Sequence, residues 1–319
     1  SQFTLEWLNQ RKSEKPFFLY VSHKAAHADF IPAERHAYRY KDQKLPVHKD
    51  WKGNKVIEQG KPLWVQNQRN SRHGIEYAYY THLDMEQYYQ RYCETLLAVD
   101  DSVGELMHWL DESGESENTL VLYMGDNGFL FGEHGLIDKR NAYEESMRIP
   151  LMVKFPGVVS KGLKVPSMVA NIDIAPTLLD VAGVRIPEHM DGRSFSPMLK
   201  GKNTPWRQYL LYEYFWERNY PQTPTTHSLR GDRFKYIRYH GIWDKDELYD
   251  LESDPDELQN LIREPQHQSR IKDMNRVLFD MLELSKGKEI PLQRDRGTQF
   301  FHRAAGGSSA SGFTSDFYQ

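Results

Sequence analysis

Short apolar runs along the chain predict three buried strands. They are rich in aromatic and β-branched residues and lie at positions 17–22, 119–124 and 149–155. Each run ends in polar residues or glycines, which is where a strand of a buried sheet reaches the protein surface. Between the first two runs, residues 29–75 carry many charges and several prolines without a sustained period, which predicts a long surface excursion.

Two helices are predicted between and after these strands. From about residue 85 to residue 110, apolar side chains recur at steps of three and four, the spacing of an amphipathic helix. Residues 173–181 carry a helix-start signature, with Pro176 near the first turn and Gly183 after the end. Strands that alternate with helices predict an α/β fold with a large mixed, mainly parallel sheet flanked by helices.

A change of pattern after about residue 206 predicts a smaller C-terminal antiparallel sheet with a helix. Its short strands and its helix are expected at 209–214, 234–239, 247–251 and 269–284. The final residues are charged and then rich in Gly and Ser, a composition typical of flexible linkers. We therefore expect three parts, at residues 1–205, 206–286 and 287–319.

The composition narrows the classes of protein. The 319 residues include 41 Lys and Arg against 45 Asp and Glu, a net charge of −4, so a nucleic-acid partner is not expected. Apolar runs such as residues 17–21 are far shorter than the roughly 20 residues of a membrane span. The single cysteine, Cys93, excludes an internal disulfide and is expected to be a buried thiol inside a helix. The first residues carry no secretory signal, so the chain is either cytosolic or lacks its beginning.

Residues 125–140 form the densest cluster of glycines and polar side chains, directly after a predicted strand. Asp126 and Asn127 offer the oxygen ligands that Ca²⁺ or Mg²⁺ prefers, although the same pair also suits a simple turn. Lys139 and Arg140 follow, and cations beside a metal would suit a tetrahedral oxyanion. Two adjacent basic residues can equally be a solvated surface.

A second set of polar residues follows the first predicted strand. Because imidazole titrates near neutral pH, His23 and His27 could each donate a proton or bind a metal. A histidine in a loop can also do neither. Lys24 adds a cation to the same segment. Because the carboxyl ends of parallel strands meet at one edge of a sheet, we expect His27 and Asp126 to lie on the same rim.

Four ordered blocks of the sequence resemble the type I sulfatases, relatives of alkaline phosphatase. The central block consists of Asp126-Asn127-Gly128, Gly132-Glu133-His134-Gly135, Lys139-Arg140 and residues 143–151. The other three blocks are residues 17–27, residues 173–177 and residues 247–257. In this order the four blocks span about 240 residues of the chain, although a motif match remains a hypothesis until its context confirms it.

The resemblance implies roles for individual residues. Asp126 and Asn127 would bind the Ca²⁺ that polarises the sulfate, with Mg²⁺ less favoured. Lys139 would contact a sulfate oxygen, and His27 would protonate the leaving alkoxide. Lys24 lies in a matching block and is a candidate substrate contact, whereas His134 is expected to support packing.

One part of the family pattern has no counterpart in the sequence. The family's nucleophile is a formylglycine made from the Cys or Ser of a Cys/Ser-x-Pro-x-Arg motif, and Cys93 has no Pro or Arg at those offsets. The family's Asp-Asp pair after its first strand has no match either. We therefore expect an N-terminal section of about 150 residues to be missing, or to be supplied by a companion chain. By itself the polypeptide should be catalytically incompetent.

The segment 212–230 is rich in aromatic and polar side chains, which suit a carbohydrate ring. It is similar to bacterial sulfatases that act on N-acetylglucosamine-6-sulfate in mucin or glycosaminoglycan chains. The candidate substrate contacts are Trp216, Arg218 and His227, although Trp216 could instead pack between the two parts of the chain.

The resemblance as a whole predicts a Ca²⁺-dependent hydrolase of a sulfated sugar. By family it would work in the periplasm, outside the cell or in the lysosome. Two alternatives stay open: a phosphoester or phosphonate hydrolase of the same superfamily, and a glycan-binding protein that has lost the nucleophile.

Overall fold

The computed structural model describes residues 1–12, 15–27, 30–44, 60–69, 71, 74, 84–218 and 220–287. The chain divides into two compact units. The first comprises residues 1–46, 82–123 and 151–163, and the second comprises residues 47–81, 124–150 and 164–319. Across the described residues, no helix combines the length and the apolarity that crossing a membrane requires.

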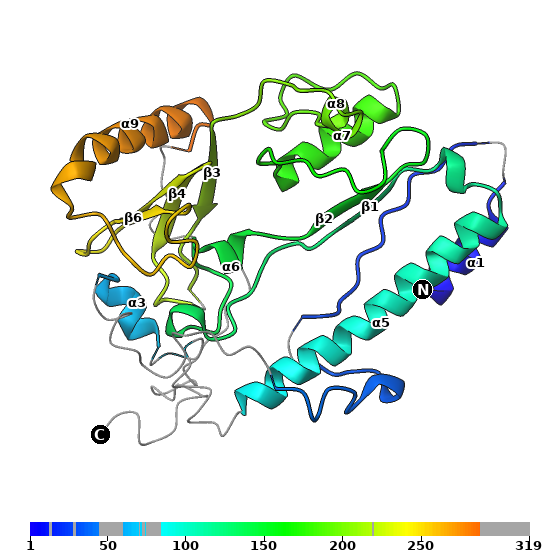
Figure 1. Ribbon diagram of the computed structural model, residues 1–319, viewed down its shortest axis with the longest axis horizontal. Coiled ribbons are helices and arrows are strands. Elements are labelled where there is room, and N and C mark those ends of the chain that lie inside the picture. The colour runs from blue at the N-terminus through cyan, green and yellow to red at the C-terminus, as the bar shows by residue number, and fades with distance from the viewer. Residues whose placement is uncertain are drawn as a thin grey trace, which may run out of the picture. The chain divides into compact units, whose positions relative to one another are not determined.

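The first unit is built on one long helix. This helix, α5 (Met85–Glu112), confirms the element predicted at 85–110, and it begins at Asp84, whose carboxylate accepts the backbone N–H groups of Glu86 and Gln87. The short helix α1 (Gln2–Gln10) runs alongside it (Figure 1), where the Trp109 indole N–H donates to Asn9 Oδ1 at 2.8 Å. Cys93 lies in α5 and is half-buried rather than buried.

Two further predicted strands of this unit are confirmed, and one is wrong. Strands β1 (Val121–Met124) and β2 (Leu151–Lys154) pair in a two-stranded sheet. Residues 17–22 form no strand, and Phe18 is 73% and Tyr20 81% exposed. An apolar run becomes a buried strand only when a neighbour pairs with it, and the described part of the chain offers no such neighbour here. The short 3₁₀ turns of this unit are Glu34–His36 and Ser116–Asn118.

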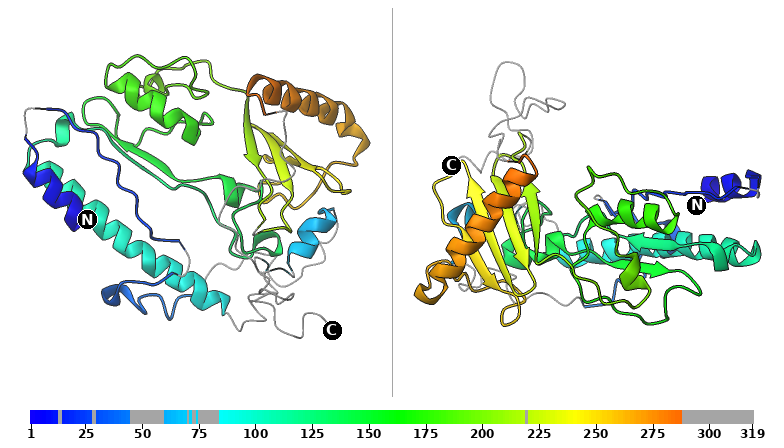
Figure 2. Two further views of the ribbon diagram at one scale, coloured as in Figure 1. Left: turned by 180° about the vertical axis from the view of Figure 1, so that it is seen from behind. Right: turned by 90° about the horizontal axis from the view of Figure 1, so that it is seen from above.

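A four-stranded antiparallel sheet dominates the second unit (Figure 2). Its order is β3 (Tyr209–Tyr214), β4 (Thr225–Gly231), β5 (Phe234–His240) and β6 (Glu247–Asp250). Helix α9 (Gln268–Leu284) packs Met274, Leu278 and Leu282 against Leu229 and Leu248 of this sheet. The strands predicted at 209–214, 234–239 and 247–251 and the helix predicted at 269–284 are confirmed.

Strand β4 was not predicted, because its sequence reads as part of a polar connection. It contains Thr225, Thr226, His227, Ser228 and Arg230, yet nearly every residue of it is buried. A central strand is covered on both faces, so its polar side chains are satisfied or enclosed by neighbours rather than by water.

The remaining elements of the second unit are short. They are α3 (Leu63–Gln68), α6 (Glu144–Met147), α7 (Ile174–Val181), α8 (Ser196–Leu199) and 3₁₀ turns at Glu133–Gly135, Asn171–Asp173 and Pro265–His267. Helix α7 confirms the element predicted at 173–181. The three-part division of the chain stays a prediction, and residues 288–319 of the expected tail lie outside the described residues.

A second apolar cluster lies on the sheet of this unit and positions the candidate site. It joins α3, the segment 130–143 and strands β5 and β6 through Trp64, Val65, Leu130, Leu136, Ala142, Tyr143, Ile237, Tyr239 and Tyr249. The segment that follows β1 is therefore fixed on a rigid support rather than left as a surface loop.

Candidate active site

The turn after β1 is held tightly by the segment that leads into β2. The backbone N–H of Gly128 donates to Ser146 O at 2.9 Å, and that of Gly125 to Pro150 O at 3.3 Å. A Cβ atom on Gly128 would lie 1.9 Å from the Glu145 carbonyl oxygen, so only glycine allows this approach. The packing presents the two residues between these glycines to solvent.

Asp126 and Asn127 are both exposed at the tip of this turn. Asp126 Oδ1 accepts the Asn127 backbone N–H at 2.9 Å, and the Asn127 side-chain nitrogen donates to Gly128 O at 2.7 Å. The second carboxylate oxygen and the amide oxygen are the hard donors that Ca²⁺ prefers, so the pair fits that ion in kind. Because Ca²⁺ takes about six to eight oxygen ligands, these residues could hold it only in part.

Lys139 emerges from a doubled-back segment of the same unit. The segment is closed by two backbone hydrogen bonds, from Leu130 N to Asp138 O at 2.8 Å and from Gly132 N to Leu136 O at 2.9 Å. Lys139 is half-buried, and its neighbours in the chain are the buried Asp138 and the largely buried Arg140. The structure therefore carries Asp126, Asn127 and Lys139 in one compact unit.

His27 and Lys24 are exposed residues of the first unit. The segment before them is attached to α5 by the His23 ring, whose Nε2 lies 2.8 Å from Ser102 Oγ. Their expected position on the same rim as Asp126 stays a prediction, as does the proton-donor role of His27.

The candidate substrate contacts lie in or beside the connection between β3 and β4. Trp216 is half-buried, and both its nitrogens are used inside the connection: the backbone N–H donates to Thr225 Oγ1 at 2.9 Å and the indole N–H to Pro221 O at 3.3 Å. Only the ring face of Trp216 remains for a ligand. Arg218 is exposed.

His227 differs from these two because it is fully buried in β4. Its Nε2 lies 3.4 Å from Glu213 Oε1, and its ring meets that of His240 edge-on at 4.9 Å between centroids. A side chain without exposed surface does not favour contact with a ligand from solvent, so the assignment of His227 stays a prediction that its burial does not support.

The sequence matches the sulfatase family over residues 1–184, more than half of the chain. A second match, to the family described as N-sulphoglucosamine sulphohydrolase, C-terminal, covers residues 132–283. The chain belongs to the sulfatase family.

Two relatives of this chain are named as sulfatases of N-acetylglucosamine. An N-acetylglucosamine-6-O-sulfatase of Bacteroides thetaiotaomicron is 29% identical over 334 residues, covering 86% of this chain and 59% of the relative. An N-acetylglucosamine-6-sulfatase of Bos taurus is 33% identical over 232 residues, covering 71% of this chain and 39% of the relative. The chain therefore spans about 40 to 60% of the length of these relatives.

Solved structures confirm the fold of the sulfatase. A protein in complex with its substrate D-glucosamine-2-N,6-O-disulfate aligns with a TM-score of 0.78 at 25% identity, covering 92% of this chain and 70% of that one. The phosphonate monoester hydrolase of Agrobacterium radiobacter aligns with a TM-score of 0.76 at 22% identity, covering 88% and 59%. The predicted α/β, alkaline-phosphatase-like class is confirmed.

One cluster of side chains in the second unit was not predicted as a group. Donor atoms of His134, Glu145 and Glu257 lie within 4.8 Å of one another, and His134 and Glu257 are fully buried. Lys235 Nζ lies 2.7 Å from Glu257 Oε1, so an ammonium already balances the charge there. The His134 ring stacks on Tyr143 at 4.0 Å between centroids, which agrees with the packing role expected from the sequence.

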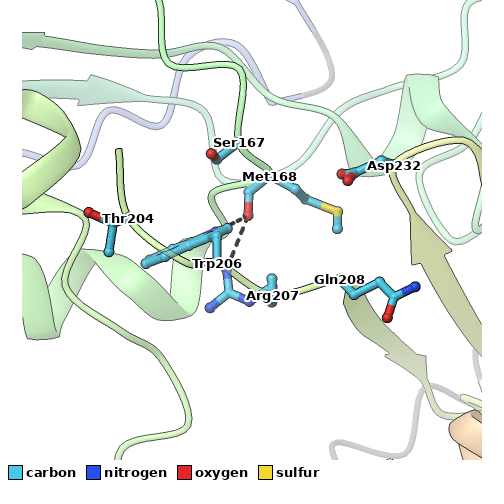
Figure 3. Close-up of a pocket in the computed structure, with 7 residues that line it drawn as sticks. All are labelled: Ser167, Met168, Thr204, Trp206, Arg207, Gln208 and Asp232. Atoms are coloured by element: carbon cyan, nitrogen blue, oxygen red, sulfur yellow. Dashed lines mark hydrogen bonds between the residues drawn. The ribbon is translucent and has the colours of Figure 1, made fainter. Parts of the chain in front are cut away.

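A polar hollow of about 340 Å³ also lies in the second unit (Figure 3). It is lined by Ser167, Met168, Thr204, Trp206, Arg207, Gln208 and Asp232, and includes none of the predicted site residues. The Arg207 guanidinium binds Asp173, and the Trp206 indole N–H donates to Met168 O at 2.7 Å. The Arg207 and Trp206 donors in this hollow are therefore already hydrogen-bonded to other groups of the protein.

Proposed function

We propose that the protein hydrolyses a sulfate ester on a carbohydrate, with N-acetylglucosamine-6-sulfate as the favoured class of substrate. One observation carries the proposal: in a chain of the sulfatase family, the exposed Asp126–Asn127 pair and Lys139 belong to one compact unit. The names of the relatives support a sulfated amino sugar as the substrate.

Asp126 and Asn127 would hold Ca²⁺ together with ligands from elsewhere in the protein. The ion, or less favourably Mg²⁺, supplies positive charge that polarises the sulfate group. The ammonium group of Lys139 would contact one sulfate oxygen and offset its negative charge. His27 would hold a proton at the bridging oxygen and give it to the leaving alkoxide.

The connection between β3 and β4 would bind the sugar. Trp216 offers a ring face to a pyranose and Arg218 offers a flexible exposed cation. Lys24, which is also exposed, stays a candidate substrate contact. The formylglycine nucleophile of the family has no motif in the 319 residues. We propose that it belongs to an N-terminal section of the same protein, or to a companion chain.

The deciding experiment compares three esters with the full-length protein: 4-nitrophenyl sulfate, 4-nitrophenyl phosphate and N-acetylglucosamine-6-sulfate. The proposal requires sulfate release from the first and third. Preference for the phosphate ester would support the phosphohydrolase alternative instead. Saccharide binding with no turnover of any ester would support the non-catalytic alternative.

The metal assignment is tested with Asp126→Ala in the same full-length protein. Because the carboxylate supplies both charge and a ligand oxygen, we expect the variant to lose at least about 10³-fold in kcat and most of its bound Ca²⁺. Asp191→Ala is the matched control, since Asp191 is an exposed acid of the same unit. Bound Ca²⁺ and near-normal kcat in Asp126→Ala would refute the assignment.

A further inference from the structure

The connection between β3 and β4 is fastened to the residues on either side of Lys139. The Arg140 guanidinium stacks on the Tyr220 ring, with Cζ 3.3 Å from the ring centroid, and its Nε lies 3.5 Å from Glu217 Oε1. Only 15% of the Arg140 side chain is exposed, whereas Glu217 is 48% exposed. A half-exposed connection is thus held by a largely buried cation.

Asp138 contributes a second attachment of the connection, through Gln68. Its Oδ1 accepts Arg140 Nη1 at 2.7 Å, and its Oδ2 accepts Gln68 Nε2 at 2.8 Å. The same Gln68 nitrogen lies 3.3 Å from Thr223 Oγ1, at the far end of the connection. The carboxylate of Asp138 is 1% exposed, so solvent does not weaken these bonds.

A tyrosine at the end of β3 also holds the connection, through Glu217. The Tyr214 hydroxyl donates to Glu217 Oε1 at 3.0 Å, at the point where β3 ends. Burial, and next the charge of Glu217, raise the pKa of Tyr214, so its hydroxyl keeps the proton that this hydrogen bond needs. Arg140, Tyr214, Glu217 and Tyr220 therefore form one clamp, which we name the Arg140 clamp.

We propose that Arg140 is a positioning residue that fixes residues 215–218 and 220–224 beside Lys139. Lys139 lies between Asp138 and Arg140 in the chain, and both neighbours are tied to this connection. This inference rests on the proposed function, because it assigns Lys139 to the sulfate and Trp216 and Arg218 to the sugar. The clamp then sets the separation between sulfate recognition and sugar recognition.

The chemistry predicts which substrates depend on the clamp. A sulfated saccharide contacts Lys139 through its sulfate and the connection through its ring, so loosening the connection weakens its binding. A small aryl sulfate presents the same sulfate without the saccharide hydroxyls, so it makes little use of the connection. Arg140 should therefore affect KM for the saccharide and leave KM for the aryl ester nearly unchanged.

The experiment uses the full-length protein with Arg140→Ala, Arg140→Lys and Tyr220→Leu. Arg185→Ala is the matched control, because Arg185 forms an 85% exposed ion pair with Glu188 in the same unit. Two readouts are taken: KM and kcat for N-acetylglucosamine-6-sulfate and 4-nitrophenyl sulfate, and amide hydrogen exchange of residues 215–224. Thermal unfolding checks that each variant is folded, and Tyr220→Leu keeps the Asp138–Arg140 pair if Arg140→Ala does not fold.

For Arg140→Ala and Tyr220→Leu we expect about a tenfold rise in KM for the saccharide, with kcat for both esters within about threefold. Exchange of residues 215–224 should accelerate about tenfold over wild type and over Arg185→Ala. In Arg140→Lys, neither the KM for the saccharide nor the exchange rate should return fully to the wild-type value, since an ammonium lacks the planar face that stacks on Tyr220.

Three results would overturn the inference. Unchanged exchange of residues 215–224 in the folded variants would show that Arg140 does not hold the connection. Equal rises in KM for both esters would show that it does not separate sugar from sulfate recognition. Wild-type KM and wild-type exchange in Arg140→Lys would show that stacking of the guanidinium on Tyr220 is not required.

Failure of the proposed function is distinguishable from these outcomes. If wild-type protein releases sulfate from neither ester, the proposed function is wrong. The exchange experiment still decides whether Arg140 fixes the connection, because it needs no turnover. Calorimetric titration with N-acetylglucosamine-6-sulfate then decides whether the clamp controls saccharide affinity.

Discussion

Arg207 binds Asp173 through two hydrogen bonds, from Nη1 to Oδ2 and from Nη2 to Oδ1, both of 2.5 Å. The Asp173 carboxylate also accepts the backbone N–H groups of Ala170 and Arg193, each at 2.8 Å. Asp173 is fully buried at the start of α7, and Arg207 precedes β3. One carboxylate therefore joins the start of α7 to the segment that leads into the antiparallel sheet.

Asp173→Asn should destabilise the protein strongly. The substitution leaves the guanidinium of Arg207 without its charged partner in a site where its side chain is only 10% exposed. Breaking a buried pair of this kind typically costs about 3–5 kcal/mol of unfolding free energy. Urea denaturation measures the loss, with Asp191→Asn as an exposed control expected to change stability by less than about 0.5 kcal/mol. A loss below about 1 kcal/mol in Asp173→Asn would contradict the role of the pair.

Lys235 is a cation of a buried network of ion pairs in the second unit. Its Nζ lies 2.7 Å from Glu257 Oε1 and 2.8 Å from Glu144 Oε1, and both Lys235 and Glu257 are fully buried. Burial opposes ionisation of Glu144, yet Lys235 and Arg230 hold its pKa at about 2. We expect Lys235→Met to cost about 3–5 kcal/mol of unfolding free energy, because it removes the ion-pair partner of the buried Glu257, whereas Glu144 keeps Arg230.

The pH dependence of that loss follows from Glu257. Burial, partly offset by Lys235, raises its pKa from 4.5 to about 7. In Lys235→Met, protonation relieves the unpaired charge at low pH, so the loss should be greater at pH 8 than at pH 6. Exposed Lys200→Met serves as the control. A loss that does not change between these two pH values would exclude Glu257 as the carboxyl that Lys235 compensates.

The sequence predicts those elements whose pattern is local. The apolar repeat of α5 and the short strands β3, β5 and β6 could be predicted, because a helix face or an apolar strand is written in consecutive residues. Strand β4 could not, because its neighbours on the sheet, rather than its own composition, decide that His227 and Ser228 are buried.

The candidate site shows the same limit. Asp126, Asn127 and Lys139 could be named from a polar cluster after a strand, since that chemistry is contiguous. The function of Arg140 as an attachment point could not, because its partner Tyr220 lies 80 positions away and only the folded sheet brings them together. The adjacent charges of Asp138, Lys139 and Arg140 were the one local signal.

His240 should make stability depend on pH below neutrality. Burial, and then the nearby charges of His227 and Arg238, lower its pKa from 6.5 to about 4. The unfolded chain takes up this proton at about pH 6.5, whereas the folded protein resists it until about pH 4. Stability is therefore complete above pH 6.5 and declines as the pH falls toward 4.

The size of this effect is limited because His240 is only partly buried. The shift corresponds to at most about 3 kcal/mol, which solvent screening reduces to about 1–2 kcal/mol. Urea denaturation measures the unfolding free energy at pH 7 and pH 4.5. The difference between the two values should be about 1–2 kcal/mol smaller in His240→Gln than in wild type. The exposed His189→Gln should retain the wild-type dependence. If the unfolding free energy changes equally between these pH values in all three proteins, His240 titrates alike in the folded and unfolded states.

His27→Ala should separate proton donation from general loss of structure. A poor leaving group, such as a sugar alkoxide, needs a proton as the ester bond breaks, whereas 4-nitrophenolate leaves without one. We expect kcat for N-acetylglucosamine-6-sulfate to fall by about 10² to 10⁴, and kcat for 4-nitrophenyl sulfate to fall by less than about tenfold. His189→Ala, which removes an exposed histidine of the second unit, should change neither. Equal losses on the two esters would assign His27 to binding or packing, because only a general acid distinguishes leaving groups by their basicity.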